Sequence, residues 1–403
     1  MDPPAIPPSS IDLAALPPWI MTSEPGSFAH ETFRVRIPAI VREIVALNDF
    51  PADVRDALEE LRAEVVGGFI RGLREDAPDR HLWDAAAAPY AGRSWLAVPW
   101  YWGEAYLYRR VLEATRYFEP GPWAGFDPYG AKKRLQWAPE AAPAAAEALL
   151  EAVPAGQEPA FEHFVHASLW GNRTDLSYEI AAHLGGTTSP QHERDNLLVD
   201  DTPLLWRYLA TGRRRRLAIL ADNAGTELLA DLALVDFLLT AGLIDETTLY
   251  LKPQPFFVSD AMPKDVGDGL DALSRRGGTA EGLNRRVRGY LEGGRLRLRT
   301  HWHSATSLFY FEMPEDLRSD LANMDLVLLK GDVNYRRLVG DVHWPPATPF
   351  RDVAAYFPAP LAALRTMKGE MVTGLGPGDA DRLAAEDPDW MVNGRRGLVQ
   401  ARL

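Results

Sequence analysis

The fold is decided by the stretch LAILADNAGTE, residues 217–227. Its first four residues are apolar and predict a buried strand. Asp222 and Asn223 follow the strand, Gly225 permits a tight turn, and Thr226 opens a helix. A buried strand that runs through a polar turn into a helix is typical of open α/β sheets, which bind ligands at the carboxyl ends of their strands.

The same alternation continues through the second half of the chain. We expect strands at 217–220, 247–251, 296–300 and 325–329, and helices at 227–240, 263–275 and 314–322. Strands that alternate with helices favour a mostly parallel sheet covered on both faces. Residues 151–403 are therefore predicted to form a three-layer α/β/α sandwich.

The first half has helical periodicity. Apolar residues recur at helical spacing in three segments, 32–45, 54–72 and 104–118. This pattern predicts a helical bundle over residues 26–150. Residues 1–25 are rich in proline and are expected to be an extended, poorly ordered arm on the surface. The Ala-, Pro- and Glu-rich segment 138–159 is expected to join the two parts, with the boundary near residue 150.

Composition excludes several classes of protein. The 403 residues carry 43 Lys and Arg against 56 Asp and Glu, a net charge of −13 that repels a nucleic-acid backbone. There are no cysteines, so disulfides, thiolate nucleophiles and cysteine-type zinc sites are ruled out. The chain opens without a secretory signal pattern, and no stretch is long and apolar enough for a membrane span. We expect a cytoplasmic protein without nucleic-acid or membrane partners.

The polar residues after the first two strands are candidate metal ligands. Asp222 beside Asn223 offers a carboxylate and an amide oxygen, which suit a hard divalent cation such as Mg²⁺ or Mn²⁺. Asp260 follows an apolar run and precedes a helix, where a third ligand from a neighbouring strand end is expected. Both segments are also compatible with a simpler role, the first as an Asx-capped turn and Asp260 as a helix cap.

Two later segments carry candidate substrate-binding residues. The stretch KGDVNYRRL, residues 330–338, is dense in polar groups directly after a strand, and its cations are suited to clamp a phosphoryl group. Lys368 is one of only six lysines among the 43 basic residues. Where arginine is the default cation, a lysine indicates a need for a compact point charge, although a plain surface lysine is the alternative.

Two other features are misleading. The run Arg213 to Arg216 is interpreted as a solvated loop, because the acidic chain disfavours nucleic acid. His301 and His303 are placed at strand spacing, but no third metal ligand lies nearby in the sequence.

Taken together, six segments resemble the metal-dependent damage-control phosphatase family, long labelled a domain of unknown function. The segments are Trp102–Arg110, Ser168–Ser177, Asp222–Glu227, Ser259–Asp260, Lys330–Arg336 and Arg365–Lys368. The last is similar to the Arg-Thr-x-Lys motif of the subfamily that includes acidic residue methyltransferase relatives. The segments follow the family's order, so the resemblance covers nearly the whole chain.

The resemblance implies an α/β/α domain with an N-terminal helical bundle that hydrolyses phosphomonoesters, chiefly sugar phosphates such as fructose 1-phosphate, with a divalent metal. The implied roles are metal ligation by Asp222, Asn223 and Asp260, substrate binding by Asp332, Asn334, Tyr335, Arg336 and Lys368, and a place beside the site for Glu227. We expect Glu227 to be the first candidate for the catalytic base. The metal is open among Mn²⁺, Mg²⁺, Co²⁺ and Ni²⁺, because oxygen ligands discriminate poorly.

The attacking group is expected to be water rather than Asp222, since a carboxylate bound to a metal through its reactive oxygen is a poor nucleophile. An S-adenosylmethionine-dependent protein-glutamate carboxyl methyltransferase is the alternative, because that activity is ascribed to relatives in the subfamily. The chain has no glycine-rich strand-turn-helix of the usual methyl-donor kind. A catalytically silent binding protein on the same fold is a third possibility.

Overall fold

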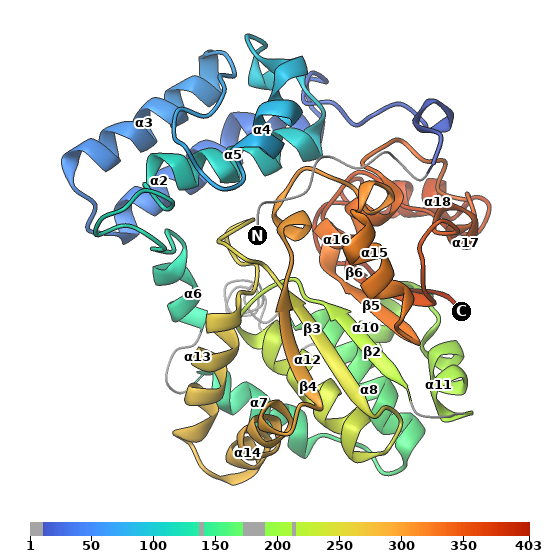
Figure 1. Ribbon diagram of the computed structural model, residues 1–403. Coiled ribbons are helices and arrows are strands. Elements are labelled where there is room, and N and C mark those ends of the chain that lie inside the picture. The colour runs from blue at the N-terminus through green and yellow to red at the C-terminus, as the bar shows by residue number, and fades with distance from the viewer. Residues whose placement is uncertain (1–10, 137–140, 172–189, 212–214) are drawn as a thin grey trace.

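The computed structural model describes residues 11–136, 141–171, 190–211 and 215–403. A seven-stranded sheet lies between two layers of helices, and a helical bundle is placed beyond one end of the strands (Figure 1). The predicted α/β/α class with an N-terminal bundle is confirmed. None of the helices in the described ranges combines the length and the apolar run that a membrane span needs.

The sheet is almost entirely parallel. Its strands are β1 (Leu197–Asp200), β2 (Arg216–Leu220), β3 (Glu246–Leu251), β4 (Leu296–Thr300), β5 (Leu326–Lys330), β6 (Leu361–Thr366) and β7 (Gly397–Arg402), in the order β1-β7-β6-β5-β2-β3-β4. Only β6 and β7 are antiparallel neighbours. The chain leaves β2 toward β3 and β4 and then returns to β5 on the other side of β2. This reversal creates the crevice at the carboxyl ends where open α/β sheets bind ligands.

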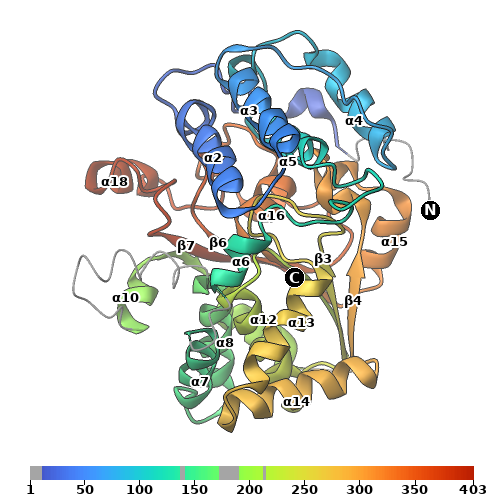
Figure 2. The same cartoon turned by 90° about the vertical axis from the view of Figure 1, so that its left-hand side faces the viewer.

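The strands alternate their side chains between two apolar layers. In β2, Leu217 and Ile219 pack on one face, and Ala218 and Leu220 on the other. The first face is covered by α7 (Ala141–Glu151), α8 (Gln157–Trp170), α11 (Thr202–Ala210), α12 (Thr226–Thr240), α13 (Pro263–Ser274) and α14 (Gly278–Glu292). The second face is covered by α15 (Glu315–Ala322), α16 (Gly331–Val339), α17 (Phe350–Val353), α18 (Asp379–Glu386) and the bundle. Figure 2 shows α7, α8 and α14 gathered together, apart from α15 and the bundle.

The bundle is built around one fully enclosed helix. Its helices are α1 (Phe28–Glu31), α2 (Ile37–Leu47), α3 (Ala52–Gly67), α4 (Arg80–Ala87) and α5 (Trp100–Ala114), with a π-helical turn, Thr32–Arg36, between α1 and α2. In α5 every side chain from Trp100 to Leu112 is buried. The expected helix at 54–72 ends early, at Gly67, because the chain turns there into the segment that runs to α4.

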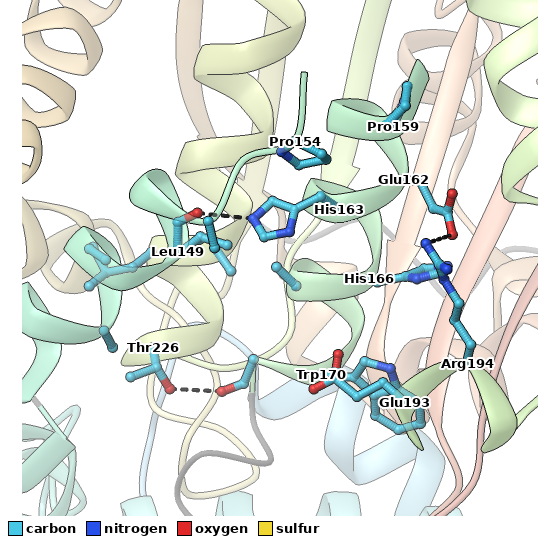
Figure 3. Close-up of a pocket in the computed structure, with 17 residues that line it drawn as sticks. Leu149, Pro154, Pro159, Glu162, His163, His166, Trp170, Glu193, Arg194 and Thr226 are labelled. Atoms are coloured by element: carbon cyan, nitrogen blue, oxygen red, sulfur yellow. Dashed lines mark hydrogen bonds and ion pairs between the residues drawn. The ribbon is translucent and has the colours of Figure 1, made fainter. Parts of the chain in front are cut away.

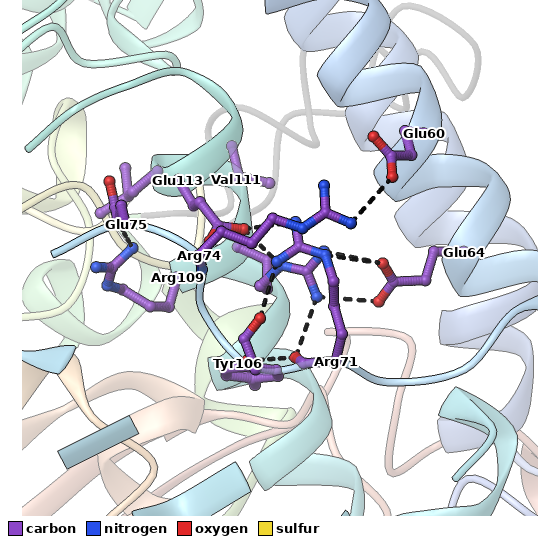
Figure 4. A network of polar contacts seen from close by, with 12 residues as sticks. Glu60, Glu64, Arg71, Arg74, Glu75, Tyr106, Arg109, Val111 and Glu113 are labelled. Atoms are coloured by element: carbon purple, nitrogen blue, oxygen red, sulfur yellow. Dashed lines mark hydrogen bonds and ion pairs between the residues drawn. The ribbon is translucent and has the colours of Figure 1, made fainter. Parts of the chain in front are cut away.

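Ion pairs hold this bundle together (Figure 4). Arg110 of α5 pairs with Glu64 of α3 at 2.9 Å and with Glu113 at 3.0 Å. Arg71, between α3 and α4, reaches the same Glu113 at 2.7 Å. Because Arg110 is buried, its five donors must be satisfied inside the protein, and the network ties three segments of the bundle to one another.

The described part of the proline-rich arm, residues 11–25, is anchored to the rest of the protein at Ile20, and its definition as a separate arm stays a prediction. Ile20 is 1% exposed, and its backbone N–H donates to the carbonyl of Asp341 at 2.9 Å. The N–H of Trp100 donates in turn to the carbonyl of Ile20, also at 2.9 Å. The Ile20 side chain is therefore buried between the segments of Asp341 and Trp100, although the sequence around it is rich in proline. Residues 1–10 lie outside the described residues.

The division near residue 150 stays a prediction. The predicted joining helix is present as α7, and it packs against α12 and α14 on the first face of the sheet. The preceding short helix, α6 (Gly130–Gln136), approaches the carboxyl ends of the strands through Lys133.

Candidate active site

Asp222 and Asn223 lie where β2 ends, above the centre of the sheet. The backbone turns at Gly225, whose φ is +75°, and α12 begins at the next residue. The loop that follows β3 runs antiparallel to this turn: the N–H of Ala261 donates to the carbonyl of Asp222 at 2.8 Å, and Asn223 and Asp260 form a bridge. Two segments far apart in sequence are thus joined by backbone bonds, and the three predicted metal ligands come together.

The loop that delivers Asp260 has an unusual backbone. Phe257 and Val258 both have positive φ, 43° and 65°, in a chain where only one other described non-glycine residue does. Such conformations cost about 1–3 kcal/mol each and persist only where the surroundings fix them. The Phe257 ring lies 4.8 Å from the ring of Tyr108 in α5, which fixes the loop against the bundle.

The two carboxylates of the site are buried and affect each other. Burial, and then the charges of Glu227 and Asp260, raise the pKa of Asp222 well above its ordinary value. Burial also raises the pKa of Asp260, against the opposing charge of Lys252. Oδ2 of Asp260 accepts no hydrogen bond, although Nζ of Lys252 lies 3.2 Å away.

These residues fit a divalent cation. A cation between Asp222 and Asp260 would favour both ionised forms and would use the unsatisfied oxygen of Asp260. No group of three His, Cys, Asp or Glu in the described ranges is arranged to hold a metal ion. A metal here would need a ligand besides carboxylates and imidazoles; the amide oxygen of Asn223 is one such donor, and its role as a ligand stays a prediction.

Asn223 is held from both ends of its amide. Its Nδ2 donates to Oδ2 of Asp222 at 2.7 Å and to Oε2 of Glu227 at 2.9 Å, and its Oδ1 accepts from the hydroxyl of Ser259. The other oxygen of Glu227 accepts from Nζ of Lys330 at 3.0 Å. Both oxygens of Glu227 are therefore engaged in orienting neighbours.

Lys330 belongs to the segment 330–338 but is not among its named substrate-binding residues, and the structure places it at this site. It is 1% exposed at the end of β5, and it pairs with Asp231 at 2.8 Å as well as with Glu227. Ser168 donates its hydroxyl to Asp231 at 2.6 Å and accepts from Lys330 at its carbonyl oxygen. Burial raises the pKa of Asp231 to about 6, while Lys330 opposes that rise.

The scarcity of lysine could have located the site. Lys252 is buried beside Asp260, and Lys133 of α6 donates to the carbonyl of Asp260 at 2.7 Å. Lys132, Lys133 and Lys368 line one cleft beside the site, and Lys264 shares the carboxylate of Asp127 with Lys133. Five of the six lysines therefore lie at the site or in the cleft, and Lys264 is joined to them through Asp127; of the six, Lys368 alone is a predicted site residue.

The segment after β5 is a helix rather than the expected polar turn. Gly331, with a φ of +84°, turns the chain out of the strand, and α16 starts at that residue. Asp332 accepts from Arg365 at 2.7 Å and from the backbone N–H of Lys368 at 3.2 Å. Asp332 thereby fixes the loop that carries Lys368.

The other predicted substrate-binding residues of α16 contact protein groups. Nδ2 of Asn334 donates to the carbonyls of Leu220 and Ala221, each at 3.2 Å. The hydroxyl of Tyr335 donates to Gln400 at 2.9 Å. Their role in binding substrate stays a prediction.

Arg336 joins the sheet domain to the bundle. Its guanidinium pairs with Asp341 at 2.8 Å and with Glu104 of α5 at 2.7 Å, and it lies 3.7 Å from the centre of the Trp100 ring. It is buried, so its contacts orient the bundle against α16. Its predicted contact with substrate also stays a prediction.

A cleft of about 730 Å³ opens between the bundle and the carboxyl ends of the strands. It is lined by Phe28, Arg36, Ala39, Ile40, Glu43, Lys132, Lys133, Phe257, Val258, Ser259, Lys368, Val392, Asn393 and Gly394. Four of these side chains are cationic and one is anionic, in a chain whose net charge is −13. Such a cleft attracts anions against the average field of the protein.

A second cavity, of about 490 Å³, lies between α7, α8, α10 (Pro190–Asp195) and α12 (Figure 3). Nε2 of His163 donates to the carbonyl of Leu149 at 2.9 Å, and Arg194 pairs with Glu162 at 2.8 Å. None of the predicted site residues lines this cavity. The cleft beside Ser259 and Lys368 is therefore the better candidate for substrate.

Some of the sequence features lie outside the described residues, and the histidine pair has a different structure from the one expected. Residues 172–177 of the resembling segment that starts at Ser168, and Arg213 and Arg214 of the arginine run, lie outside the described residues. His301 caps the short 3₁₀ turn Trp302–Ala305 and His303 lies within it, so neither occupies a strand. His303 contacts Arg337 and His301 contacts Asp316, so they do not form a metal pair.

Known proteins are similar to this chain along most of its length. A family model described as the damage-control phosphatase ARMT1-like domain matches residues 32–383. The damage-control phosphatase ARMT1 of Danio rerio is 30% identical, with 96% of this chain and 97% of that protein covered. Those of Mus musculus and Homo sapiens are 29% and 28% identical, each with 96% of this chain and 99% of the relative covered. A solved DUF89 family structure from Pyrococcus horikoshii has a TM-score of 0.47 at 13% identity, covering 92% of this chain and 98% of that one.

Proposed function

The chain belongs to the ARMT1-like damage-control phosphatase family, and from that premise we propose that it hydrolyses phosphomonoesters of sugars or damaged metabolites with the help of a divalent metal. Fructose 1-phosphate-like compounds are the proposed substrates. Mn²⁺ or Mg²⁺ is the proposed metal, and Co²⁺ or Ni²⁺ would suit the same oxygen ligands.

The observation that carries the proposal is the bridge between Asn223 and Asp260, which brings the buried carboxylates of Asp222 and Asp260 together, both with raised pKa. Asp222, Asn223 and Asp260 would hold the metal. When bound, a divalent metal neutralises phosphate charge and makes a water molecule more acidic, which is the chemistry that phosphomonoester hydrolysis requires.

The side chains around these ligands have distinct proposed roles. Lys368 reaches the substrate's phosphoryl oxygens from the cleft and stabilises the charge that they carry in the transition state. Asp332 positions Lys368 through its backbone N–H, and Lys252 offsets the charge of Asp260. Water is the proposed nucleophile, for the reason given for Asp222 above.

Glu227 has contacts that favour a positioning role over that of the base. One of its oxygens accepts from Lys330 and the other from the amide of Asn223. Because an amide can be turned end for end, an acceptor fixed beside Nδ2 determines which way Oδ1 of Asn223 points. We assign to Glu227 and Lys330 the orientation of Asn223 for metal binding.

The methyltransferase alternative gains no support. The relatives reported above are described as phosphatases, and none is described as a methyltransferase. The silent binding protein would require a broken set of ligands, whereas Asp222, Asn223 and Asp260 are all present and adjacent.

The deciding experiment is phosphate release from a panel of sugar phosphates by metal-stripped protein, with each divalent ion returned in turn. Activity that returns with Mn²⁺ or Mg²⁺, together with a metal-dependent rise in Tm, supports the proposal. A rise in Tm without phosphate release from any substrate contradicts the phosphatase function but not the metal site. Saturable binding of S-adenosylmethionine without metal would favour the methyltransferase.

A further inference from the structure

The cleft beside the site has two walls that carry separate cations. Lys368 belongs to the loop after β6, on the wall formed by the sheet domain. It lines the cleft together with Ser259, whose hydroxyl donates to the Oδ1 of Asn223, so this wall adjoins the predicted metal ligands. Arg36 belongs to the bundle and lines the same cleft from that side.

The remaining cations of the cleft are already neutralised. Lys132 pairs with Glu43, the only carboxylate of the lining, at 2.7 Å. Lys133 pairs with Asp265 at 3.0 Å and with Asp127 at 3.3 Å. The charges of Lys132 and Lys133 are therefore offset by neighbouring carboxylates.

Arg36 and Lys368 differ from them. Within the part of the chain that the structure describes, neither side chain has a recorded hydrogen bond or ion pair, and Arg36 is exposed. Arg36 acts electrostatically on Glu104, but that carboxylate is paired with Arg336 at 2.7 Å. Each wall of the cleft therefore has one cationic side chain, Arg36 or Lys368, that makes no ion pair with the described residues.

The local backbone also distinguishes Arg36. It ends the π-helical turn Thr32–Arg36, and π-helical turns occur frequently at functional sites. The apolar side chains of Phe28, Ile40 and Phe257 line the cleft as well. They suit the carbon skeleton of a ligand that has an anionic group at each end.

We propose that Arg36 forms a second anion subsite, and that the preferred substrate is a phosphomonoester bearing another anionic group, either a second phosphate or a carboxylate. The proposal rests on the proposed phosphatase function and adds the substrate class. Lys368 and the metal ligands receive the phosphate that is cleaved, and Arg36 binds the distant anion. The guanidinium suits either anion, because it offers paired N–H donors to planar or tetrahedral oxygen groups.

The test compares three substrates in the metal-loaded full chain: fructose 1-phosphate, fructose 1,6-bisphosphate and 6-phosphogluconate. The variants are Arg36→Gln, Arg36→Lys and the control Arg34→Gln. Arg34 is exposed on the same turn, outside the cleft, with one ion pair at 4.0 Å to Glu31. Because Arg36 is exposed, its replacement should leave Tm unchanged, which is measured alongside.

We expect wild type to favour at least one of the two substrates with a second anion. Arg36→Gln should lower kcat/KM for that substrate by about 10- to 100-fold, the range of a charge-assisted hydrogen bond, and leave fructose 1-phosphate nearly unchanged. Arg36→Lys should recover part of the loss, and Arg34→Gln should match wild type. A loss of kcat/KM confined to the bisphosphate identifies the second anion as a phosphate. A loss confined to 6-phosphogluconate identifies it as a carboxylate.

Four results would contradict the proposal. Turnover of fructose 1-phosphate with no preference for either larger anion, or an equal effect of Arg36→Gln on all three substrates, overturns the subsite while leaving the phosphatase intact. An equal loss of kcat/KM in Arg34→Gln would show that the effect comes from the overall positive charge of this turn and not from the position of Arg36 in the cleft. Silence with every substrate and metal overturns the phosphatase function, and the subsite falls with it.

Discussion

Gly331 packs directly against the carboxylate of Asp222. A Cβ atom at Gly331 would lie 1.9 Å from Oδ2 of Asp222, far inside van der Waals contact. The register of the sheet explains this proximity: Leu220 of β2 is level with Leu329 of β5, and Asp222 and Gly331 each follow two residues later. The glycine therefore both turns the chain into α16 and leaves the space that the Asp222 carboxylate occupies.

Gly331→Ala should displace Asp222 and nearly abolish activity. The added methyl group clashes with the carboxylate, and the φ of +84° disfavours any side chain. A shift of about 1 Å in a ligand is expected to lower kcat/KM by about 100-fold. Kinetics with saturating metal and thermal unfolding measure the two effects.

Gly340→Ala is the matched control. Gly340 follows the other end of α16, has a φ of +79°, and its Cβ would meet nothing closer than 3.6 Å. It should lose about 1 kcal/mol of stability but keep its activity. Equal activity losses in the two variants would show that the contact with Asp222 is not the cause.

Asp222→Asn and Asp260→Asn should both remove activity, but they should differ in the stability of the metal-free protein. Burial is the first cause of the raised pKa of Asp222, which has no ion pair with the described residues, so a neutral amide there removes an unfavourable buried charge, and Tm of the stripped variant should equal or exceed that of wild type. Asp260→Asn also removes the partner of the buried Lys252, so its stripped form should have a lower Tm than the Asp222 variant. Added Mn²⁺ should raise Tm in wild type only, and phosphate release should fall by about 10³-fold. A variant that still gains Tm with Mn²⁺ would remove that residue from the proposed ligand set.

The strands that flank the crevice were predictable, and the reason is physical. β2 and β5 are short, largely apolar runs buried on both faces, and β3 is a buried run of threonine and apolar residues; such runs are visible in one sequence. The strands β1, β6 and β7 were missed. β1 is exposed at its end, and β6 is interrupted by the charge of Arg365, which is buried only because Asp332 and two backbone carbonyls surround it.

The candidate site was predictable in part. Asp222, Asn223 and Asp260 follow strand ends, so their meeting at one edge of the sheet follows from topology. Lys330 and Asp231 gave no such signal, since a lysine at a strand end and an aspartate within an apolar helix are ambiguous until their 2.8 Å contact is seen. The interior hydrogen bonds of Asn334 and Tyr335 likewise depend on residues distant in sequence.

Lys330→Met should strongly destabilise the protein. Nζ of Lys330 lies within 3.0 Å of both Glu227 and Asp231, and its loss leaves two buried carboxylates uncompensated. Breaking a buried pair in this way costs about 3–5 kcal/mol. Lys132→Met, which removes a half-exposed pair with Glu43, should cost about 0–1 kcal/mol. Denaturant unfolding at pH 7 measures both, and a Lys330 variant as stable as the Lys132 variant would contradict the proposed importance of the network.

His303 should make the free energy of unfolding depend on pH. Burial, and then the charge of Arg337, lower the pKa of His303 well below 6.5. Arg337 donates to its Nδ1 at 2.8 Å, and Nε2 lies 3.0 Å from the carbonyl of Phe309, so the neutral ring with hydrogen on Nε2 satisfies both partners. His301 and Lys252 also disfavour a second positive charge there.

The direction of this pH dependence follows from whether the folded or the unfolded chain binds the proton at His303. Below about pH 6.5 the unfolded chain protonates His303 and the folded chain does not, so stability falls as pH decreases. This group alone should lower the free energy of unfolding by about 1.4 kcal/mol between pH 8 and pH 5.5. His303→Gln keeps an acceptor for Arg337 and a donor for Phe309, and the difference in stability between wild type and this variant should change with pH by that amount. His343→Gln, at an exposed histidine, is the control and should follow wild type at every pH. A wild type and His303→Gln pair with parallel pH profiles would show that His303 takes up its proton in the folded protein as readily as in the unfolded chain.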